Sequence, residues 1–322
     1  MRVLSDVDLH RFLDMGACIA AVEAAFAARA EGRPATSAVA ALELVGGVLH
    51  AKLGRLDGRR RYAIAKINAN FPGNRQARGL PTIQGVALLF DASSGSVLAA
   101  LDSPALTAIR TAAATAVAAK YLATATASSV SIVGCGVQAA PHIEALLCVR
   151  PIRKVSLFDL DRDAARKLAD EVSRQFDVSV HVAADLRAAL GDTEIVVTAT
   201  PSREPILRLG DVRPGTFVAA VGADSETKQE LDPLLLREAI VVVDDLAQCS
   251  HFGDLHHALA AGTMRQENVR GSLDQVVAGK VAGRTSDEEI TVFDSTGVAI
   301  EDVAAAAIAF ERAEAAGAGV LV

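Results

Sequence analysis

The sequence predicts an α/β protein with a doubly wound parallel sheet in one domain and an α+β region in a second. Three observations lead to this fold class. The chain has 322 residues, about twice the common size of a single domain. Short apolar runs alternate with helical segments after residue 128, as in doubly wound parallel sheets. Before that point, residues 37–101 form β-rich runs joined by hairpin-length links, which favours an antiparallel or mixed sheet.

The composition excludes several classes of function. The chain is 51% hydrophobic and 22% charged, which is typical of a folded protein with a large core. Its net charge of −7 indicates neither a nucleic-acid partner nor an anionic membrane surface. Only 4% of the residues are aromatic and Trp is absent, which argues against platforms that stack nucleic-acid bases.

The cysteines and the start of the chain predict the compartment. Four cysteines show no metal-ligand spacing, so we expect free thiols and no metal site. The first residues lack the apolar core of a signal peptide. The longest uncharged run, residues 121–143, is broken by polar residues and Pro141, so we expect no membrane span. A cytoplasmic protein is therefore expected.

Helical and β-type patterns assign the first half of the chain. Apolar residues recur at helical spacing over residues 9–28, and Ser5 is a suitable cap for this helix. An Ala-rich helix is expected over residues 105–123, with Ser103 as its cap and Pro104 as its first residue. Between the two helices, strands are expected at residues 39–45, 47–53, 62–70, 83–91 and 96–102.

The second half alternates strands and helices. Helices are expected from about residue 138, at 162–176 and at 186–190. The pattern ends with a strand near residue 292 and an Ala-rich helix at 298–315, which would be free to pack on the first domain. The apolar runs that suit buried parallel strands lie at residues 129–134, 154–159, 178–183, 194–200, 216–222 and 239–245.

A glycine-rich turn predicts a dinucleotide site of the Rossmann type. Gly134 and Gly136 stand where a strand gives way to a helix, and Ala139 completes a GxGxxA pattern. The first glycine permits a tight turn, the second lets the backbone approach a pyrophosphate, and the helix N-terminus, at Val137 and Gln138, attracts the phosphates.

The next strand ends in a carboxylate suited to a ribose. Asp159 lies 25 residues after Gly134, near the spacing expected for a side chain that binds the ribose 2′-hydroxyl. A carboxylate there favours NAD because it would repel the 2′-phosphate of NADP. Arg162 could neutralise such a phosphate, so NADP stays open.

Three further strand ends carry polar residues, at 198–201, at 221–224 and at Asp244-Asp245. Ligands of such sheets bind outside the carboxyl ends of the strands. Asp224 lies just beyond one of these ends, where it either faces the cofactor or caps a helix, and Lys228, four residues later, is either part of the site or a surface charge. The strand-end residues expected at the cofactor are Thr198, Ala199, Thr200, Val221 and Gly222.

Two cations stand in otherwise apolar surroundings. Lys66 lies inside the run YAIAKINA, and Arg110 lies in the Ala-rich helix between Thr107 and Thr111. A buried cation is costly unless it is paired or functional, and a buried Arg often holds a carboxylate. From the residues alone, each cation is as well explained by a structural ion pair as by substrate binding.

Seven segments together resemble the ornithine cyclodeaminase/mu-crystallin family. The similarity covers about residues 5–312 in order. It implies a homodimer in which residues 113–298 form a Rossmann domain for NAD(P), and residues 1–112 with 299–322 form a domain for substrate binding and dimerisation. The segments are KINANFPGN, GLPTIQGVALLFD, LDSPALTAIRTAAATAVAAKYLA, IVGCGVQA, TATPSREPIL, VGADSETKQELD and DSTGVAIEDVAAA.

The resemblance also implies roles for residues at matching positions. Lys66 and Arg110 would grip a substrate carboxylate, and Lys66 and Asp224 would be the catalytic pair, with Asp224 as the acid or base. Lys228 would support Asp224. The cofactor would be contacted by Thr111 at its phosphates and by the loop Ser295, Thr296 and Gly297 at its nicotinamide.

The chain departs from the family pattern on the substrate side. The family's Pro-x-Arg is Pro34-Ala35-Thr36 here, so an Arg expected to bind the substrate carboxylate is missing. Lys52 or Arg55 could replace its charge. The Glu of the usual Gly-Glu-Leu motif is Asp254, a milder change.

The function implied by the resemblance is hydride transfer between NAD(P) and the α-carbon of an imino or amino acid. An imine reductase, a ketimine reductase and an alanine-dehydrogenase-like enzyme all fit this description. One alternative is an ornithine cyclodeaminase, which would form proline and ammonia with catalytic NAD. A second alternative is a non-catalytic protein that binds a nucleotide and a ligand.

Overall fold

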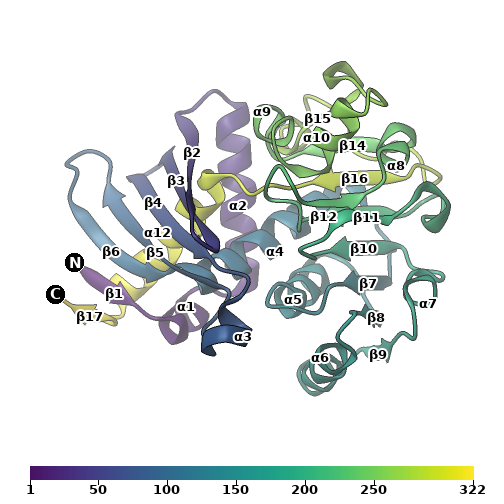
Figure 1. Cartoon of the computed structure of the whole chain (residues 1–322). Coiled ribbons are helices and arrows are strands. Elements are labelled where there is room, and N and C mark those ends of the chain that lie inside the picture. Colours follow the sequence, from purple (N-terminus) through teal and green to yellow (C-terminus); the bar gives the residue numbers. More distant parts are fainter. The chain divides into compact units, whose positions relative to one another are not determined.

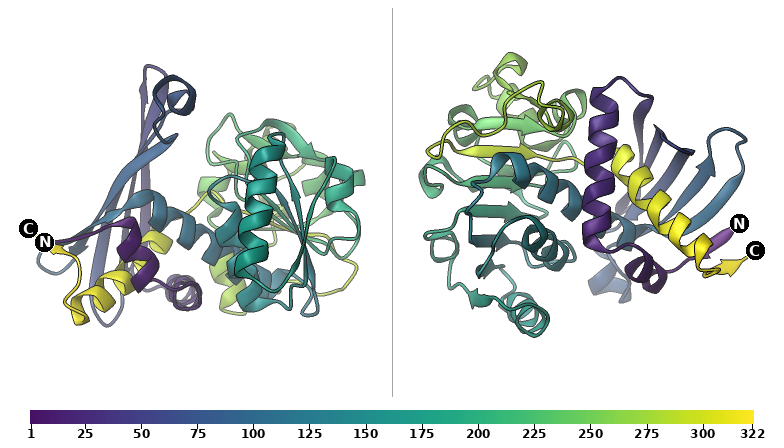
Figure 2. Two further views of the ribbon diagram at one scale, coloured as in Figure 1. Left: turned by 90° about the horizontal axis from the view of Figure 1, so that it is seen from below. Right: turned by 180° about the vertical axis from the view of Figure 1, so that it is seen from behind.

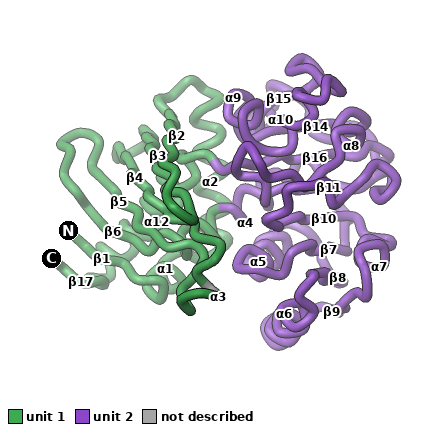
Figure 3. Tube along the Cα trace, viewed as in Figure 1, with its two compact units in different colours: residues 1–110, 298–322 green, residues 111–297 purple. Residues whose placement is uncertain are grey.

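The computed structural model describes residues 1–322, apart from the side chain of Arg75, and shows an α/β chain (Figure 1). It divides into two compact units (Figure 3). Unit 1 comprises residues 1–110 and 298–322, and unit 2 comprises residues 111–297. The limits expected from the sequence lie within two residues of these.

Unit 1 contains a mixed sheet. Strand β1 pairs in parallel with β6, and the other neighbours are antiparallel. The expected mixed sheet is therefore confirmed, but the two short strands at the chain ends were missed. The strand order is β17 (Val320–Leu321), β1 (Arg2–Leu4), β6 (Val97–Asp102), β5 (Ile83–Asp91), β4 (Arg61–Asn70), β3 (Gly47–Asp57) and β2 (Ala35–Leu44).

The helix expected over residues 9–28 is two helices, α1 (Asp6–Phe12) and α2 (Met15–Ala30). Ser5 caps α1 as expected. The continuous-helix prediction was wrong because Asp14 starts a new helix: its side chain accepts a hydrogen bond from the backbone N–H of Ala17 at 2.8 Å.

The Ala-rich helix is α4 (Ser103–Leu122), which begins in unit 1 and continues into unit 2. Its expected cap was wrong. Asp102 accepts the hydrogen bond from the N–H of Ala105 at 2.8 Å, whereas the Ser103 hydroxyl donates to Asn68. A further short helix, α3 (Asn74–Arg78), was not expected.

The last helix, α12 (Ala299–Ala315), packs on one face of the unit 1 sheet together with α2 (Figure 2). We call this the inner face of the sheet. The residues on it include Lys52, Gly54 and Lys66. Gly54 allows the close approach, because a Cβ there would lie 2.8 Å from the Cβ of Ala299. The alternate residues of the same strands form the outer face.

Unit 2 contains a parallel sheet with helices on it, which confirms the predicted fold class. Its central strands are apolar and fully buried, as expected for a sheet covered on both faces. The strand order is β15 (Gly271–Ser272), β14 (Ile240–Val243), β16 (Thr291–Asp294), β12 (Phe217–Ala220), β10 (Ile195–Thr198), β7 (Ser129–Val133), β8 (Lys154–Phe158) and β9 (Ser179–Val182).

The helices expected in unit 2 are present as α5 (Ala139–Val149), α6 (Arg162–Gln175) and α7 (Leu186–Leu190). Several shorter elements were missed because few residues carry their periodicity. None of the described helices is long and apolar enough to cross a membrane. The missed elements are β15, β11 (Arg203–Leu207), β13 (Gln229–Leu231), α8 (Pro233–Glu238), α9 (Leu246–Cys249), α10 (Gly253–Ala260) and α11 (Leu273–Val277), with single 3₁₀ turns at Leu209–Asp211 and Gln266–Asn268.

Candidate active site

The glycine turn between β7 and α5 has the geometry of a phosphate-binding turn. Gly134 has φ +100°, and a Cβ there would lie 2.7 Å from the carbonyl oxygen of Ala199. A Cβ on Gly136 would meet nothing within 4 Å, so the space above this residue is open. Ala139 is fully buried, which lets α5 pack closely. The turn therefore leaves room for a pyrophosphate at a helix N-terminus.

Asp159 follows β8 and reaches back to this turn. Its carboxylate accepts hydrogen bonds from the backbone N–H groups of Cys135 at 2.7 Å and Asp161 at 2.8 Å. The side chain that the spacing suggested for a ribose is thus beside the glycine turn. Arg162, which left NADP open, is exposed in the first turn of α6.

One buried carboxylate holds the ends of β10 and β12. Glu230 accepts hydrogen bonds from the Thr200 N–H at 2.7 Å and from the hydroxyls of Thr198 and Thr200, both at 2.8 Å. It also accepts one from the N–H of Gly222 at 2.8 Å. Ala199 donates from its backbone to Val133 of β7. Glu230 thus joins two loops that were expected at the cofactor.

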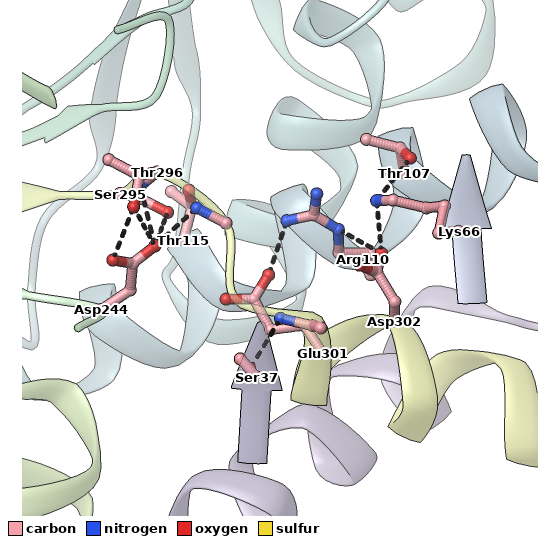
Figure 4. Close-up of polar contacts among 12 residues, drawn as sticks. Ser37, Lys66, Thr107, Arg110, Thr115, Asp244, Ser295, Thr296, Glu301 and Asp302 are labelled. Atoms are coloured by element: carbon pink, nitrogen blue, oxygen red, sulfur yellow. Dashed lines mark hydrogen bonds and ion pairs between the residues drawn. The ribbon is translucent and has the colours of Figure 1, made fainter. Parts of the chain in front are cut away.

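A second buried carboxylate holds the loop after β16. Asp244 accepts hydrogen bonds from the backbone N–H groups of Thr296 at 2.7 Å and Gly297 at 2.6 Å, and from the hydroxyl of Ser295 at 3.2 Å (Figure 4). Gly297 has φ +77°, a conformation that favours glycine. The loop expected at the nicotinamide is therefore closely fixed within unit 2.

Two more carboxylates lie in the same interior. Asp254 accepts hydrogen bonds from the N–H groups of Glu230 and Leu231, and Asp294 accepts one from Leu255. Burial raises the pKa of Asp294 to about 7, and the charges of Asp244 and Glu230 add to this effect. Burial also raises the pKa of Glu230 and of Asp254. Neighbouring buried carboxylates cannot all ionise, so this group retains protons near neutral pH.

In unit 1, Lys66 and Arg110 meet at one carboxylate. Asp302 accepts a hydrogen bond from Lys66 Nζ at 2.7 Å and from Arg110 Nε at 2.8 Å (Figure 4). Glu301 pairs with Arg110 Nη1 at 2.7 Å, and the Thr107 hydroxyl accepts from Lys66 at 3.1 Å. All four charged side chains are at most 4% exposed. The structural ion pair and the group of candidate substrate residues are thus the same cluster.

The charges of this cluster shift one another. Burial, together with the charges of Arg110 and Lys52, lowers the pKa of Lys66 to about 7, whereas Asp302 opposes this shift. Burial would raise the pKa of Asp302, but the charges of Arg110 and Lys66 outweigh burial and hold it below its ordinary value. Lys66 therefore changes its protonation state near neutral pH, while Asp302 stays ionised.

The strand register decides between Lys52 and Arg55. Lys52 stands directly opposite Lys66 in the β3–β4 pair, so both side chains lie on the inner face. Arg55 stands opposite Thr36 in the β2–β3 pair and lies on the outer face, where it pairs with Asp57. Lys52 is therefore the cation that shares a face with Lys66.

Asp224 lies in the loop after β12, within unit 2. Its side chain is about half exposed and accepts a hydrogen bond from Lys228 Nζ at 2.6 Å. The Lys228 backbone carbonyl in turn contacts the ring of His257. Lys228 is therefore the ion-pair partner of Asp224 within this loop.

The remaining expected residues lie in α4 and beside α5 and β12. Thr111 is buried in α4, Val137 is exposed just before α5, and Gln138 occupies the N-cap position of α5 without a capping hydrogen bond from its side chain. Val221 follows β12, and its N–H donates to the carbonyl of Thr198.

Sequence reasoning missed the carboxylates that organise these groups. Asp302 and Glu301 lie in the otherwise apolar segment VAIEDVAAAA, and the signal that identified Lys66, a charge within an apolar run, would have found them. Glu230 ends a run of polar residues, 224–230, and gave no such signal. Among the described residues, no group of three His, Cys, Asp or Glu side chains could hold a metal ion.

Comparison with known proteins extends these observations. The model of the ornithine cyclodeaminase/mu-crystallin family matches residues 1–317. An alanine dehydrogenase from Archaeoglobus fulgidus is 38% identical over 311 residues, which is 97% of this chain and 94% of that protein.

Solved structures also match the whole chain. An archaeal alanine dehydrogenase dimer with bound NAD is 37% identical, with a TM-score of 0.94 over 100% of this chain and 98% of that one. The Δ1-pyrroline-2-carboxylate reductase of Thermococcus litoralis, solved with NADH and L-proline, is 32% identical, with a TM-score of 0.95 over 100% of both chains.

Proposed function

The chain belongs to the ornithine cyclodeaminase/mu-crystallin family, and from this we propose that it is an NAD-dependent oxidoreductase of imino or amino acids. The reaction is hydride transfer between the nicotinamide and the α-carbon of the substrate. The observation that carries the proposal is the burial of two cations, Lys66 of β4 and Arg110 of α4, at one carboxylate in unit 1. Relatives that act on alanine and on pyrroline-2-carboxylate support this substrate class.

Unit 2 supplies the cofactor site in this proposal. The open space above Gly136 and the start of α5 take the pyrophosphate, and Asp159 takes the ribose. A carboxylate beside the ribose disfavours a 2′-phosphate, so the cofactor is NAD, as in the archaeal dehydrogenase structure. When bound, its nicotinamide supplies or accepts the hydride. The loops held by Glu230 and Asp244 complete the site.

Unit 1 supplies the substrate carboxylate site. Arg110 uses Nε and Nη1 for its two carboxylate partners, and neither of these pairs occupies Nη2. Lys66 has three N–H donors, of which two go to Asp302 and Thr107. Lys52 adds a third positive charge on the same face. Such a group favours an anionic substrate and fixes the carbon next to its carboxylate.

Asp224 is the acid or base of the proposal. Its carboxylate is about half exposed, so it exchanges protons with water, and Lys228 fixes its position. A carboxylate there stabilises the positive charge of a protonated imine and moves a proton to or from the substrate nitrogen.

The chain also forms a homodimer in this proposal. The alanine dehydrogenase structure that matches the whole chain is a dimer. The outer face of the unit 1 sheet carries exposed Leu53, Ile67 and Val86, an apolar surface that suits a second copy.

The test is a panel of reactions with purified protein. We expect it to oxidise NADH with at least one of pyrroline-2-carboxylate, piperideine-2-carboxylate, or pyruvate or oxaloacetate with ammonia. Ammonia release from ornithine with catalytic NAD, without net NADH change, would instead identify a cyclodeaminase. NADH binding with neither reaction would identify a non-catalytic binding protein.

Variants separate the two units' contributions. Lys66→Met and Asp224→Asn should each lower kcat/KM by about 100-fold or more, because each removes a group that acts on the substrate. NADH affinity should stay within about twofold of the unmodified protein. Lys167→Met, which removes an exposed cation of α6, is the control. Loss of NADH binding in Lys66→Met would contradict the assignment of Lys66 to the substrate.

A further inference from the structure

We infer that Asp302 is a positioning residue of this enzyme, which holds Lys66 and Arg110 together for the substrate carboxylate. The inference rests on the proposed function. It starts from one contact: a single oxygen of Asp302, Oδ1, accepts a hydrogen bond from Lys66 Nζ at 2.7 Å and from Arg110 Nε at 2.8 Å. Lys66 comes from β4 and Arg110 from α4, so Asp302 of α12 fixes the distance between two elements.

Burial makes this contact strong. Asp302 and Glu301 are fully buried, and Lys66 and Arg110 are almost so. In such surroundings, charges are screened much less than at the surface, and removing one partner leaves an uncompensated charge. The other Asp302 oxygen, Oδ2, is also buried and has no hydrogen-bond partner in the described part of the chain. The carboxylate therefore acts on its surroundings through Oδ1 and through its charge.

Glu301 differs from Asp302 in one useful respect. It lies in the same turn of α12 and is equally buried, and its ion pair is with Arg110, whereas Asp302 pairs with both Lys66 and Arg110. A comparison of the two carboxylates therefore separates the general effect of a lost buried charge from the particular effect of losing the partner of Lys66.

Asp302 also affects the pH at which Lys66 loses its proton. The groups that face its ammonium are Arg110 from α4, Lys52 from β3 and Asp302 from α12, with Glu301 beyond Arg110. Burial, Arg110 and Lys52 disfavour the charged amine, and Asp302 favours it. Without the charge of Asp302, Lys66 loses its proton at lower pH. Since the protonated amine binds the carboxylate, Asp302 keeps Lys66 competent at neutral pH.

The experiment compares Asp302→Asn with Glu301→Gln in the steady-state reduction of the best imino-acid substrate by NADH, as a function of pH. In the unmodified protein, KM should rise as the pH passes about 7, where Lys66 loses its proton. Asp302→Asn should raise KM by about 10- to 100-fold above that pH, the effect of losing a charge-assisted hydrogen bond. The defect should shrink as the pH falls, because Lys66 regains its proton.

The matched variant gives a different pattern. Glu301→Gln should raise KM by a factor that does not depend on pH, because the Lys66 pair is intact. NADH affinity, a property of unit 2, should be unchanged in both variants. If Asp302→Asn does not fold, Asp302→Glu takes its place, because it keeps the negative charge but changes the position of the carboxylate. Asp302→Glu should raise KM without changing the pH at which KM begins to rise.

The outcomes separate the inference from the proposed function. An unmodified protein that is inactive on the whole panel contradicts both. An active protein in which Asp302→Asn shows the pH-independent behaviour of Glu301→Gln, or in which Asp302→Glu leaves KM unchanged, contradicts the inference alone.

Discussion

The position of Lys52 in the sheet makes it the better candidate to supply the positive charge that is missing at Thr36. The family's Pro-x-Arg would put its arginine at Thr36, whose register partner Arg55 lies on the outer face. Lys52 lies on the inner face, directly opposite Lys66. Like charges in such a pair destabilise a sheet, and the Asp302 carboxylate, which pairs with Lys66 and feels the charge of Lys52, offsets part of this repulsion.

Lys52→Met should therefore weaken substrate binding. We expect KM for the imino acid to rise about tenfold, because a partly buried charged contact is lost, with NADH affinity unchanged. Steady-state kinetics at neutral pH measure this. Arg55→Met removes a cation from the same strand but from the other face, and it should leave KM within about twofold. Equal effects of the two variants would show that the face does not matter.

Charged residues in apolar runs were the best residue-level signal in the sequence. This signal identified Lys66 and Arg110, because a buried cation needs a partner or a function. It could not say which, and the structure shows partners for both: Asp302 and Glu301. Those two carboxylates are separated from their partners by 191 to 236 residues in the sequence, so no local pattern pairs them.

At the scale of elements, Glu230 joins strand ends that carry the candidate cofactor residues. Four hydrogen bonds run to its carboxylate from Thr198, Thr200 and Gly222, which follow or end β10 and β12. A Cβ at Gly222 would lie 2.3 Å from the carbonyl oxygen of Thr200. The two loops therefore have only one relative arrangement.

Glu230→Gln tests this arrangement. Glutamine has one oxygen and an NH₂ group, so some of the four donors would face another donor and lose their partner. Each buried unsatisfied donor costs about 1–3 kcal/mol, so we expect the Kd for NADH to rise about tenfold or more. Fluorescence titration with NADH measures it. Glu238→Gln, at an exposed ion pair in the same unit, should not change the Kd. An unchanged Kd in Glu230→Gln would refute the role.

Helices and strands were predictable where their hydrophobic pattern is long or repeated. The parallel strands of unit 2 and helices α5, α6 and α7 follow from apolar runs and turn signals. The break between α1 and α2 was missed because the apolar spacing continues through Leu13, and only the side chain of Asp14 starts the second helix. The position of β16 between β12 and β14 was also unpredictable, since strand order is a property of tertiary packing.

At the scale of the whole molecule, the sheet of unit 1 has one covered face and one exposed apolar face. Its inner face is covered by α2 and α12. Its outer face contains the cross-strand rows Leu53–Ala65–Leu88 and Ala51–Ile67–Val86, given by the registers of β3, β4 and β5. Leu53 is 53% exposed and Val86 41%. Such an extended apolar surface is unusual on a monomer and suits an interface between copies.

Leu53→Glu should therefore break the proposed homodimer. Burying half of a leucine contributes about 1 kcal/mol per copy, and a two-fold interface counts each site twice. The new carboxylate would also have to lose its water on association, which adds to the cost. We expect sedimentation velocity at micromolar concentration to show a dimer for the unmodified protein and mostly monomer for Leu53→Glu. Val7→Glu, at an exposed position of α1, should stay dimeric. A monomeric unmodified protein, or a variant as dimeric as its parent, would rule out this face as the interface.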